Sequence, residues 1–69
     1  MESVIRVKAS ATEMRSFFDA DHGVRCYEQL PGGYFKVRYR GWGKLNGTYT
    51  IEGLKKADLL NRLEYRKNN

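Results

Sequence analysis

The stretch Tyr34-Phe35-Lys36-Val37-Arg38-Tyr39-Arg40 alternates in its chemistry from one residue to the next. Successive side chains of a β-strand point to opposite faces, and this pattern therefore predicts a half-buried strand with an apolar face and a basic face. The apolar face carries Phe35, Val37 and Tyr39, and the basic face carries Tyr34 and three cations. A surface that combines cations with an aromatic ring is typical of proteins that bind phosphates and stack on nucleic-acid bases.

The length and the cysteine content limit what kind of domain the chain can form. A chain of 69 residues predicts one small domain, over residues 1–69, whose core buries a modest share of its surface. Cys26 is the only cysteine and His22 the only histidine, which leaves no disulfide within the chain and too few ligands for a structural zinc site. The core is therefore well packed on its own, or a partner subunit in a homodimer completes it.

The cellular compartment is indicated by the same features. A lone thiol suits a reducing environment. Residues 1–8 lack the long apolar run of a signal peptide, and no segment approaches the roughly 20 apolar residues of a membrane span. We expect a cytoplasmic protein with no membrane partner.

The positive charge of the chain is unevenly distributed. The net charge is +5, and residues 24–50 hold five basic residues against one acidic residue, whereas residues 1–23 are slightly acidic. A concentrated positive field attracts polyanions such as nucleic acid. A basic surface that only keeps the protein soluble is the alternative explanation.

The first part of the chain predicts a strand followed by a helix. Residues 3–9 have the β-branched pattern of a strand. Ser10 and Glu13 match a capping box, in which each side chain accepts a hydrogen bond from the other's backbone amide, and a helix should begin there. Gly23 suits the end of this helix because glycine readily adopts the left-handed conformation. One face of the helix is apolar and carries Met14, Phe17 and Phe18.

Residues 24–30 predict a second strand, joined to residues 34–40 by a turn at Pro31-Gly32-Gly33. If Leu30 lies opposite Phe35 across this turn, Cys26 lies opposite Tyr39. The apolar face then gains Val24, Cys26 and Leu30, and the basic face gains Arg25, Tyr27 and Gln29. Glu28 is turned inward in this register and is its one misfit.

The last part of the chain predicts a fourth strand and a second helix. Gly41-Trp42-Gly43 indicates a bulge or a sharp bend, and Asn46-Gly47 is typical of a two-residue hairpin. A strand over residues 48–51 should follow. Tyr49 and Ile51 join the core if the bulge near Trp42 flips the register, and lie on the basic face if it does not. Gly53 precedes a helix over residues 54–66, and residues 67–69 should fray. The predicted buried stripe of this helix is Ala57, Leu59, Leu60 and Leu63.

The order β-α-β-β-β-α predicts an α+β domain, with both helices packed on one face of an antiparallel sheet and the other face open to water or a partner. From the first helix onward, this order is similar to that of double-stranded-RNA-binding domains, which also place lysines at the start of the second helix, as Lys55-Lys56 are placed here. The likeness ends at Asp58-Leu59-Leu60-Asn61, where that family has an alanine-rich helix. Proteins that read DNA with a three-stranded sheet fit equally well. Topology alone does not carry function, and the sequence is identified with neither family.

The predicted nucleic-acid interface is the basic face of the sheet together with nearby segments. Its cations would pair with phosphates, and its aromatic rings would stack on unpaired bases. The predicted binding residues are Arg25, Tyr27, Tyr34, Lys36, Arg38, Arg40, Trp42, Lys44, Lys55 and Lys56. The alternatives are a solvated sheet face whose cations guard against aggregation, a Trp42 that folds over the end of the core, and two plain surface lysines on the second helix.

Patterns for catalysis and metal binding do not occur in the sequence. Asp19, Asp21 and His22 supply too few ligands, and a solvated helix end is the expected explanation. Cys26 is expected to lie buried in its strand as a small apolar residue. No phosphate-binding loop, GxSxG motif or HExxH motif is present. We expect no enzyme activity and no cofactor.

These observations predict a small, non-enzymatic nucleic-acid-binding protein with a regulatory role, whose partner is DNA or RNA. The alternative is an adaptor or inhibitor that docks on an acidic surface of a larger protein, or that self-associates. Arginine and tyrosine are frequent at both kinds of interface, and the sequence leaves both open.

Overall fold

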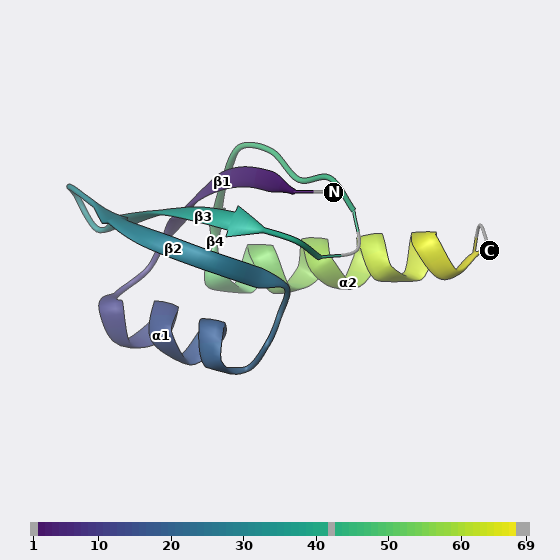
Figure 1. The fold of residues 1–69 in the computed structure, drawn as a ribbon, viewed down its shortest axis with the longest axis horizontal. Helices are drawn as coiled ribbons and strands as arrows, with labels where there is room; N and C mark the ends of the chain where they lie inside the picture. The colour runs from purple at the N-terminus through teal and green to yellow at the C-terminus, as the bar shows by residue number, and fades with distance from the viewer. Residues whose placement is uncertain (1, 42, 68–69) are drawn as a thin grey trace.

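The structure is a computed structural model that describes residues 2–41 and 43–67, with side chains as far as Glu64. It is an α+β domain with four strands and two helices, and both helices lie on the same side of the sheet (Figure 1). The elements follow one another as β1 (Ser3–Lys8), α1 (Ala11–Asp19), β2 (Val24–Leu30), β3 (Tyr34–Tyr39), β4 (Thr48–Thr50) and α2 (Ile51–Lys67).

The sheet is mixed, with the strand order β2-β3-β1-β4. β3 runs antiparallel to β1 and β2, but β4 runs parallel to β1, and the expected all-antiparallel sheet is therefore wrong. The segment after β3 passes β1 and reaches the far edge of the sheet, where the Arg6 amide donates to the Gly47 carbonyl at 3.1 Å. Asn46-Gly47 thus leads into an edge strand and does not form a hairpin with β3.

The core lies between the sheet and the two helices. The apolar face predicted for residues 34–40 is confirmed, because Phe35, Val37 and Tyr39 are all buried. The capping box is also confirmed: the Glu13 amide donates to Ser10 Oγ at 3.1 Å, and the Ser10 amide donates to Glu13 Oε1 at 2.9 Å. The buried apolar residues are Ile5, Val7, Met14, Phe17, Val24, Phe35, Val37, Tyr39, Leu45 and Leu54.

The register between β2 and β3 differs by one residue from the expected one. Leu30 pairs with Tyr34, because a three-residue turn in which Gly32 and Gly33 have φ of 79° and 82° closes the hairpin directly onto this pair. Cys26 consequently lies opposite Arg38, and it is exposed instead of buried. The slip moves Cys26, Glu28 and Leu30 to the basic face of the sheet.

This register also corrects the positions predicted for Glu28 and Tyr27. Glu28 is exposed opposite Lys36 and does not point into the core as the expected register required. Tyr27 turns toward the helices, where its ring packs edge-on against Phe18 at 5.3 Å and Phe35 at 5.7 Å between centroids. Burial of this aromatic surface favours the observed register over the alternative.

Helix α2 begins three residues earlier than expected and presents a different face to the sheet. It starts at Ile51, and the Gly53 amide donates to Thr50 Oγ1 at 3.0 Å, in the manner of a helix cap. Leu54 and Asp58 are buried under the sheet. The predicted stripe is wrong apart from Ala57, which packs against the core, because Leu59, Leu60 and Leu63 are 54%, 60% and 53% exposed.

A buried polar contact accounts for the orientation of α2. The Tyr39 hydroxyl donates to the Asp58 carboxylate, and Arg62 Nη2 lies 3.3 Å from the other oxygen of that carboxylate. A buried carboxylate needs such partners, and only one rotation of the helix brings Asp58 to Tyr39. Because this rotation is fixed, the leucines of α2 face outward.

The two glycines around Trp42 do not form a bulge within a strand. They are needed because neighbouring side chains leave no room for a Cβ atom at either position. β3 ends at Tyr39, and a Cβ atom at Gly41 would overlap the Tyr39 ring. A Cβ atom at Gly43 would lie 2.9 Å from Cγ of Asn61 on α2. Trp42 itself lies outside the described residues, as do residues 68–69 of the predicted frayed end.

Candidate nucleic-acid interface

The face of the sheet that the helices leave uncovered, called the open face below, carries three rows of side chains. Directly paired residues of neighbouring strands lie side by side on the same face. The first row is Cys26, Arg38 and Val4 on β2, β3 and β1. The second row is Glu28, Lys36, Arg6 and Thr48, and the third row is Leu30, Tyr34, Lys8 and Thr50, which include β4.

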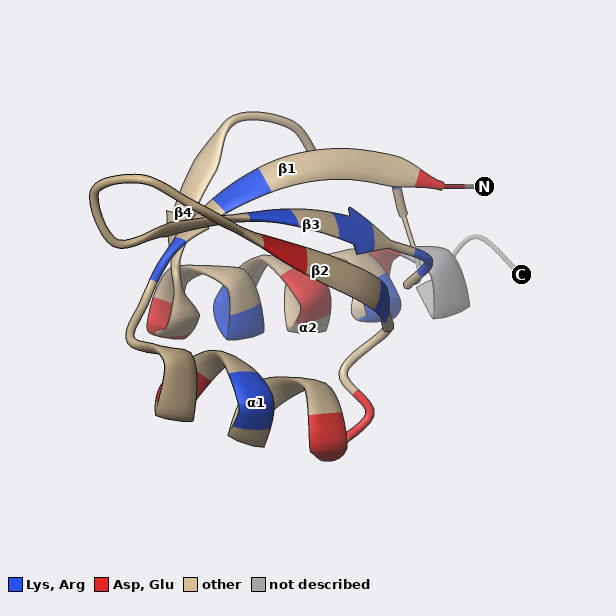
Figure 2. Cartoon of the chain, turned by 60° about the vertical axis from the view of Figure 1, so that its left-hand side comes forward, with Lys and Arg blue, Asp and Glu red and all other residues tan. Residues whose placement is uncertain are grey.

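Four exposed cations lie on the open face of the two central strands. Arg6 and Lys8 come from β1, and Lys36 and Arg38 come from β3. Figure 2 shows basic positions on these neighbouring strands, with an acidic position on β2 beside them. The strand alternation of the sequence places Lys36 and Arg38 here, as predicted.

Arg25 joins this group through a β-bulge. The pairing of β2 with β3 is irregular between Val24 and Cys26, which makes Arg25 the extra residue of the bulged strand. Its Nη1 donates to Glu2 at 2.9 Å, and Nη1 of Arg38 donates to the other oxygen of the same carboxylate at 3.3 Å. The hydrogen bond from Arg25 is the main cause that lowers the pKa of Glu2, with Arg38 adding to it. Glu2 therefore holds two of the predicted site residues together as an anion.

Tyr34 is a half-buried ring that interacts with two cations. The guanidinium of Arg6 lies over the ring at 5.0 Å from its centroid, and Nζ of Lys8 lies over it at 5.9 Å. Cation–π contacts of this kind orient both partners. Tyr34 is thus held among the cations of the open face. A base that stacked on its ring would also lie next to Arg6 and Lys8.

The remaining predicted residues do not form part of this group. Tyr27 packs on the helix side of the sheet, and the prediction that it lies on the basic face is wrong. Arg40 and Lys44 are exposed in the segment between β3 and β4. Lys55 and Lys56 lie on α2, across the sheet from the open face, and Nζ of Lys55 lies 3.7 Å from Glu52.

The position of these two lysines in the helix also differs from the expectation. Because α2 begins at Ile51, Lys55 and Lys56 fall in its second turn, and the first turn carries Glu52. An acidic residue in the first turn agrees with the helix macrodipole, which favours anions near the N-terminus of a helix.

Sequence reasoning missed Arg6 and Lys8. Both alternate with buried Ile5 and Val7, so the strand pattern of residues 3–8 carried the signal. What it could not show is that β1 lies beside β3 and places these cations on the same face as Lys36.

Other chemistry of the described residues is limited. No group of three or more His, Cys, Asp and Glu in residues 2–41 and 43–67 could hold a metal ion. Burial raises the pKa of Asp58, while Arg62 and His22 oppose that rise. The contact of Asp58 with Tyr39 gives this carboxylate a structural role.

Comparisons of the chain with protein-family models, with curated proteins and with solved structures find no match. Within the part of the chain that the structure describes, no helix is both long and apolar enough to cross a membrane.

Proposed function

We propose that this protein is a small, non-enzymatic nucleic-acid-binding protein with a regulatory role, and that it binds through the open face of its sheet. The observation that carries the proposal is the cluster of Arg6, Lys8, Lys36 and Arg38 on two adjacent central strands. Cations spaced along neighbouring strands can each neutralise a phosphate and release its counterion.

The position of these cations argues against simple protection of a sheet edge. Lysines that prevent aggregation are needed on edge strands, whose backbone groups are unpaired. β1 and β3 are the two inner strands, and each has a neighbour on both sides. Glu2 and Glu28 moderate the positive charge of the open face, but the cations outnumber them among the described residues.

Charge reversal of Arg38 tests this proposal. Arg38 is exposed, so Arg38→Glu should leave the fold intact and weaken binding to all oligonucleotides by roughly tenfold to thirtyfold at low salt. Lys56→Glu is the matched control, because it makes the same change of charge on α2, away from the open face. Fluorescence anisotropy at about 50 mM and 200 mM salt measures both variants, and circular dichroism reports their folding.

Two results would contradict the proposal. If the wild-type protein binds no oligonucleotide at low salt, the proposed function is refuted. Equal losses in Arg38→Glu and Lys56→Glu would show that binding follows the net charge of the chain and not the open face.

A second candidate function, protein binding, is favoured by the exposed leucines of α2. Leu59, Leu60 and Leu63 are each more than half exposed on the side of α2 that faces away from the sheet. Exposed apolar clusters of this kind occur at protein interfaces, including those between copies of one chain. Light scattering on wild-type protein and on Leu60→Lys tests self-association, and a pull-down that survives nuclease treatment tests an adaptor or inhibitor role.

A further inference from the structure

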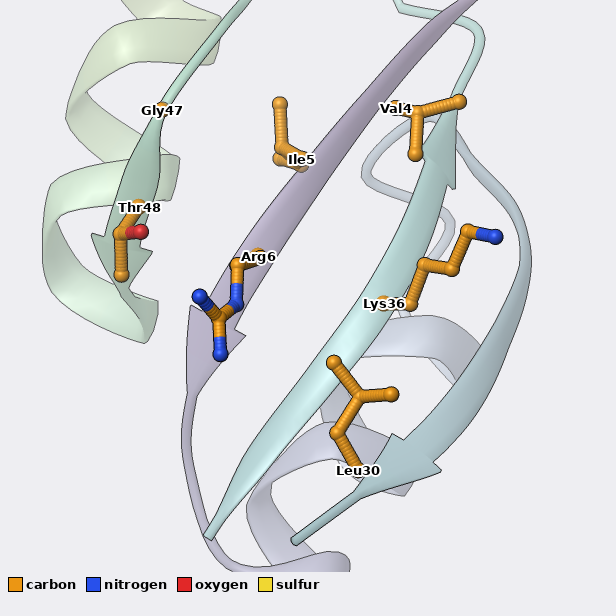
Figure 3. A pocket seen from close by; sticks show the side chains of 7 residues that line it. All are labelled: Val4, Ile5, Arg6, Leu30, Lys36, Gly47 and Thr48. Carbon is orange, nitrogen blue, oxygen red and sulfur yellow. The ribbon is translucent and has the colours of Figure 1, made fainter. Parts of the chain in front are cut away.

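A shallow hollow of about 430 Å³ lies on the open face, and Figure 3 shows the side chains around it. Lys36 and Arg6 project on either side of its middle, and Val4 and Leu30 lie toward its two ends. Thr48 borders it on the side of β4. Small-molecule sites are clefts of roughly 300–1,000 Å³ that enclose their ligand, whereas this shallow hollow would leave a bound segment partly exposed to solvent.

The middle of the hollow is suited to an anion. Arg6 and Lys36 are direct partners in the pairing of β1 with β3, and Figure 3 shows their charged ends on opposite sides of the hollow, pointing away from one another. Both side chains are long, and a phosphate that drew their charged ends toward the middle would gain two charge-assisted hydrogen bonds. The cation–π contact between Arg6 and Tyr34 orients the guanidinium before any ligand binds.

The ends of the hollow are apolar, which a site for phosphate alone would not need. Val4 is 50% exposed on a face whose central row is polar, and Leu30 is half-buried at the end of β2. Val4 lies opposite Arg38 and Leu30 lies opposite Tyr34, so the two apolar residues are separated by four residues along β3 and by two strand spacings. Ordinary sheet dimensions place them about 17 Å apart.

This separation bears on the form of nucleic acid that can use both ends. Neighbouring bases of a duplex strand are stacked about 3.4 Å apart and are paired inside the helix. Bases that lay their ring faces against Val4 and Leu30 must therefore be unstacked and unpaired. A duplex laid on the open face would present phosphates to Arg6 and Lys36, and its bases could reach Val4 and Leu30 only with their edges in a groove.

We propose that the hollow binds a single-stranded segment of nucleic acid, with a phosphate between Arg6 and Lys36 and unpaired bases against Val4 and Leu30. This inference rests on the proposed function and names the form of nucleic acid that the open face prefers. The Thr48 hydroxyl, at the border of the hollow, is placed to hydrogen-bond to the backbone or to a base edge.

Anisotropy with four fluorescent probes of about 12 nucleotides or base pairs tests the inference: oligothymidylate, oligouridylate, an abasic single strand and a DNA duplex. At least one base-containing strand should bind about fivefold more tightly than the abasic strand, because only its bases cover the apolar ends. The same strand should bind more tightly than the duplex. Comparison of oligothymidylate with oligouridylate shows whether DNA or RNA supplies the strand.

A matched pair of variants locates the effect. Val4→Ser should lower the fivefold preference for a base-containing strand to about twofold, because Leu30 remains, while the affinity for the abasic strand stays within about twofold. Ala20→Ser, a change of an exposed apolar residue to serine at the end of α1, should keep the full preference. Circular dichroism confirms that both variants are folded.

The outcomes separate this inference from the proposed function. Equal affinity of the wild type for base-containing and abasic strands overturns the inference, and so does tighter binding to the duplex. If that duplex binding is lost in Arg38→Glu, the proposed function stands without the single-strand preference. Absence of binding to every probe at low salt overturns both.

Discussion

Replacement of Glu2 by glutamine should strengthen nucleic-acid binding, because this carboxylate competes with phosphates for two arginines. Glu2 accepts from Nη1 of Arg25 at 2.9 Å and from Nη1 of Arg38 at 3.3 Å. Glu2→Gln keeps the size of the side chain and removes its charge. Both guanidinium groups then become available to phosphates, and the repulsion between a phosphate and the carboxylate disappears.

The size of the effect follows from the geometry. A phosphate that shares these guanidinium groups would lie roughly 6 Å from the Glu2 carboxylate, and the repulsion between unit charges at that distance in water corresponds to roughly a threefold change in Kd. Each additional phosphate contact should also steepen the plot of log K against log salt concentration by about 0.7 for a single strand. Anisotropy titrations over a range of salt concentrations give both quantities.

The control for this prediction is Glu52→Gln. Glu52 makes an ion pair with Lys55 on α2, so its replacement changes the net charge equally but on the other side of the sheet. It should alter the affinity far less than Glu2→Gln does. Equal gains in the two variants, or no gain in Glu2→Gln, would refute the idea that Glu2 restrains the open face.

Two further predictions concern the contact between Tyr39 and α2. Burial raises the pKa of Asp58 in the folded protein above its ordinary 3.8. The unfolded chain therefore loses this proton at a lower pH than the folded protein does. As a result, the free energy of unfolding falls as pH rises from the pKa of the unfolded chain to that of the folded protein. Asp58→Asn cannot ionise, so its free energy of unfolding relative to that of wild type should be more favourable at about pH 7 than at about pH 4, as measured by urea unfolding. The same difference at both pH values would contradict this. Gly41→Ala should cost about 1–3 kcal/mol in the free energy of unfolding, because the new methyl group meets the buried Tyr39 ring, and an unaltered urea midpoint would disprove the close approach.

The parts of the fold that the sequence predicts correctly are those that local chemistry determines. The start of α1 depends on Ser10 and Glu13, which are three residues apart and satisfy each other's backbone amides. The apolar and basic faces of β3 depend on alternation within six residues. Neither feature requires knowledge of where the rest of the chain lies, and both are confirmed.

The errors arise where a distant partner decides between local alternatives. The leucines of α2 form a plausible inward stripe, but burial of Leu54 and the contact of Asp58 with the Tyr39 hydroxyl favour a different face of the helix. A three-residue turn and a four-residue turn fit Pro31-Gly32-Gly33 almost equally, and the packing of Tyr27 on α1 and β3 distinguishes them. In each case the deciding contact joins elements that are separate in the sequence.

In the candidate site, too, the sequence predicts what local chemistry determines and misses what depends on a distant strand. Lys36 and Arg38 are found from their own strand, because alternation alone turns them away from the core. Arg6 and Lys8 have an equally clear pattern, but their relevance depends on the neighbouring position of β1 and β3, which no local pattern reveals. Sequence reasoning therefore identified half of the central cations and the face of the sheet on which all four lie.

The two surfaces considered for function are compatible, because they lie on opposite sides of the molecule. The cations project from the open face, whereas Leu59, Leu60 and Leu63 are exposed on α2, which packs beneath the sheet. Self-association through the leucines would leave both open faces uncovered and would join two of them in one particle. Binding to a long strand would then gain from multivalency, whereas binding to a strand that spans one open face would not. The dependence of affinity on strand length in wild type and in Leu60→Lys therefore distinguishes a paired arrangement of open faces from a single one.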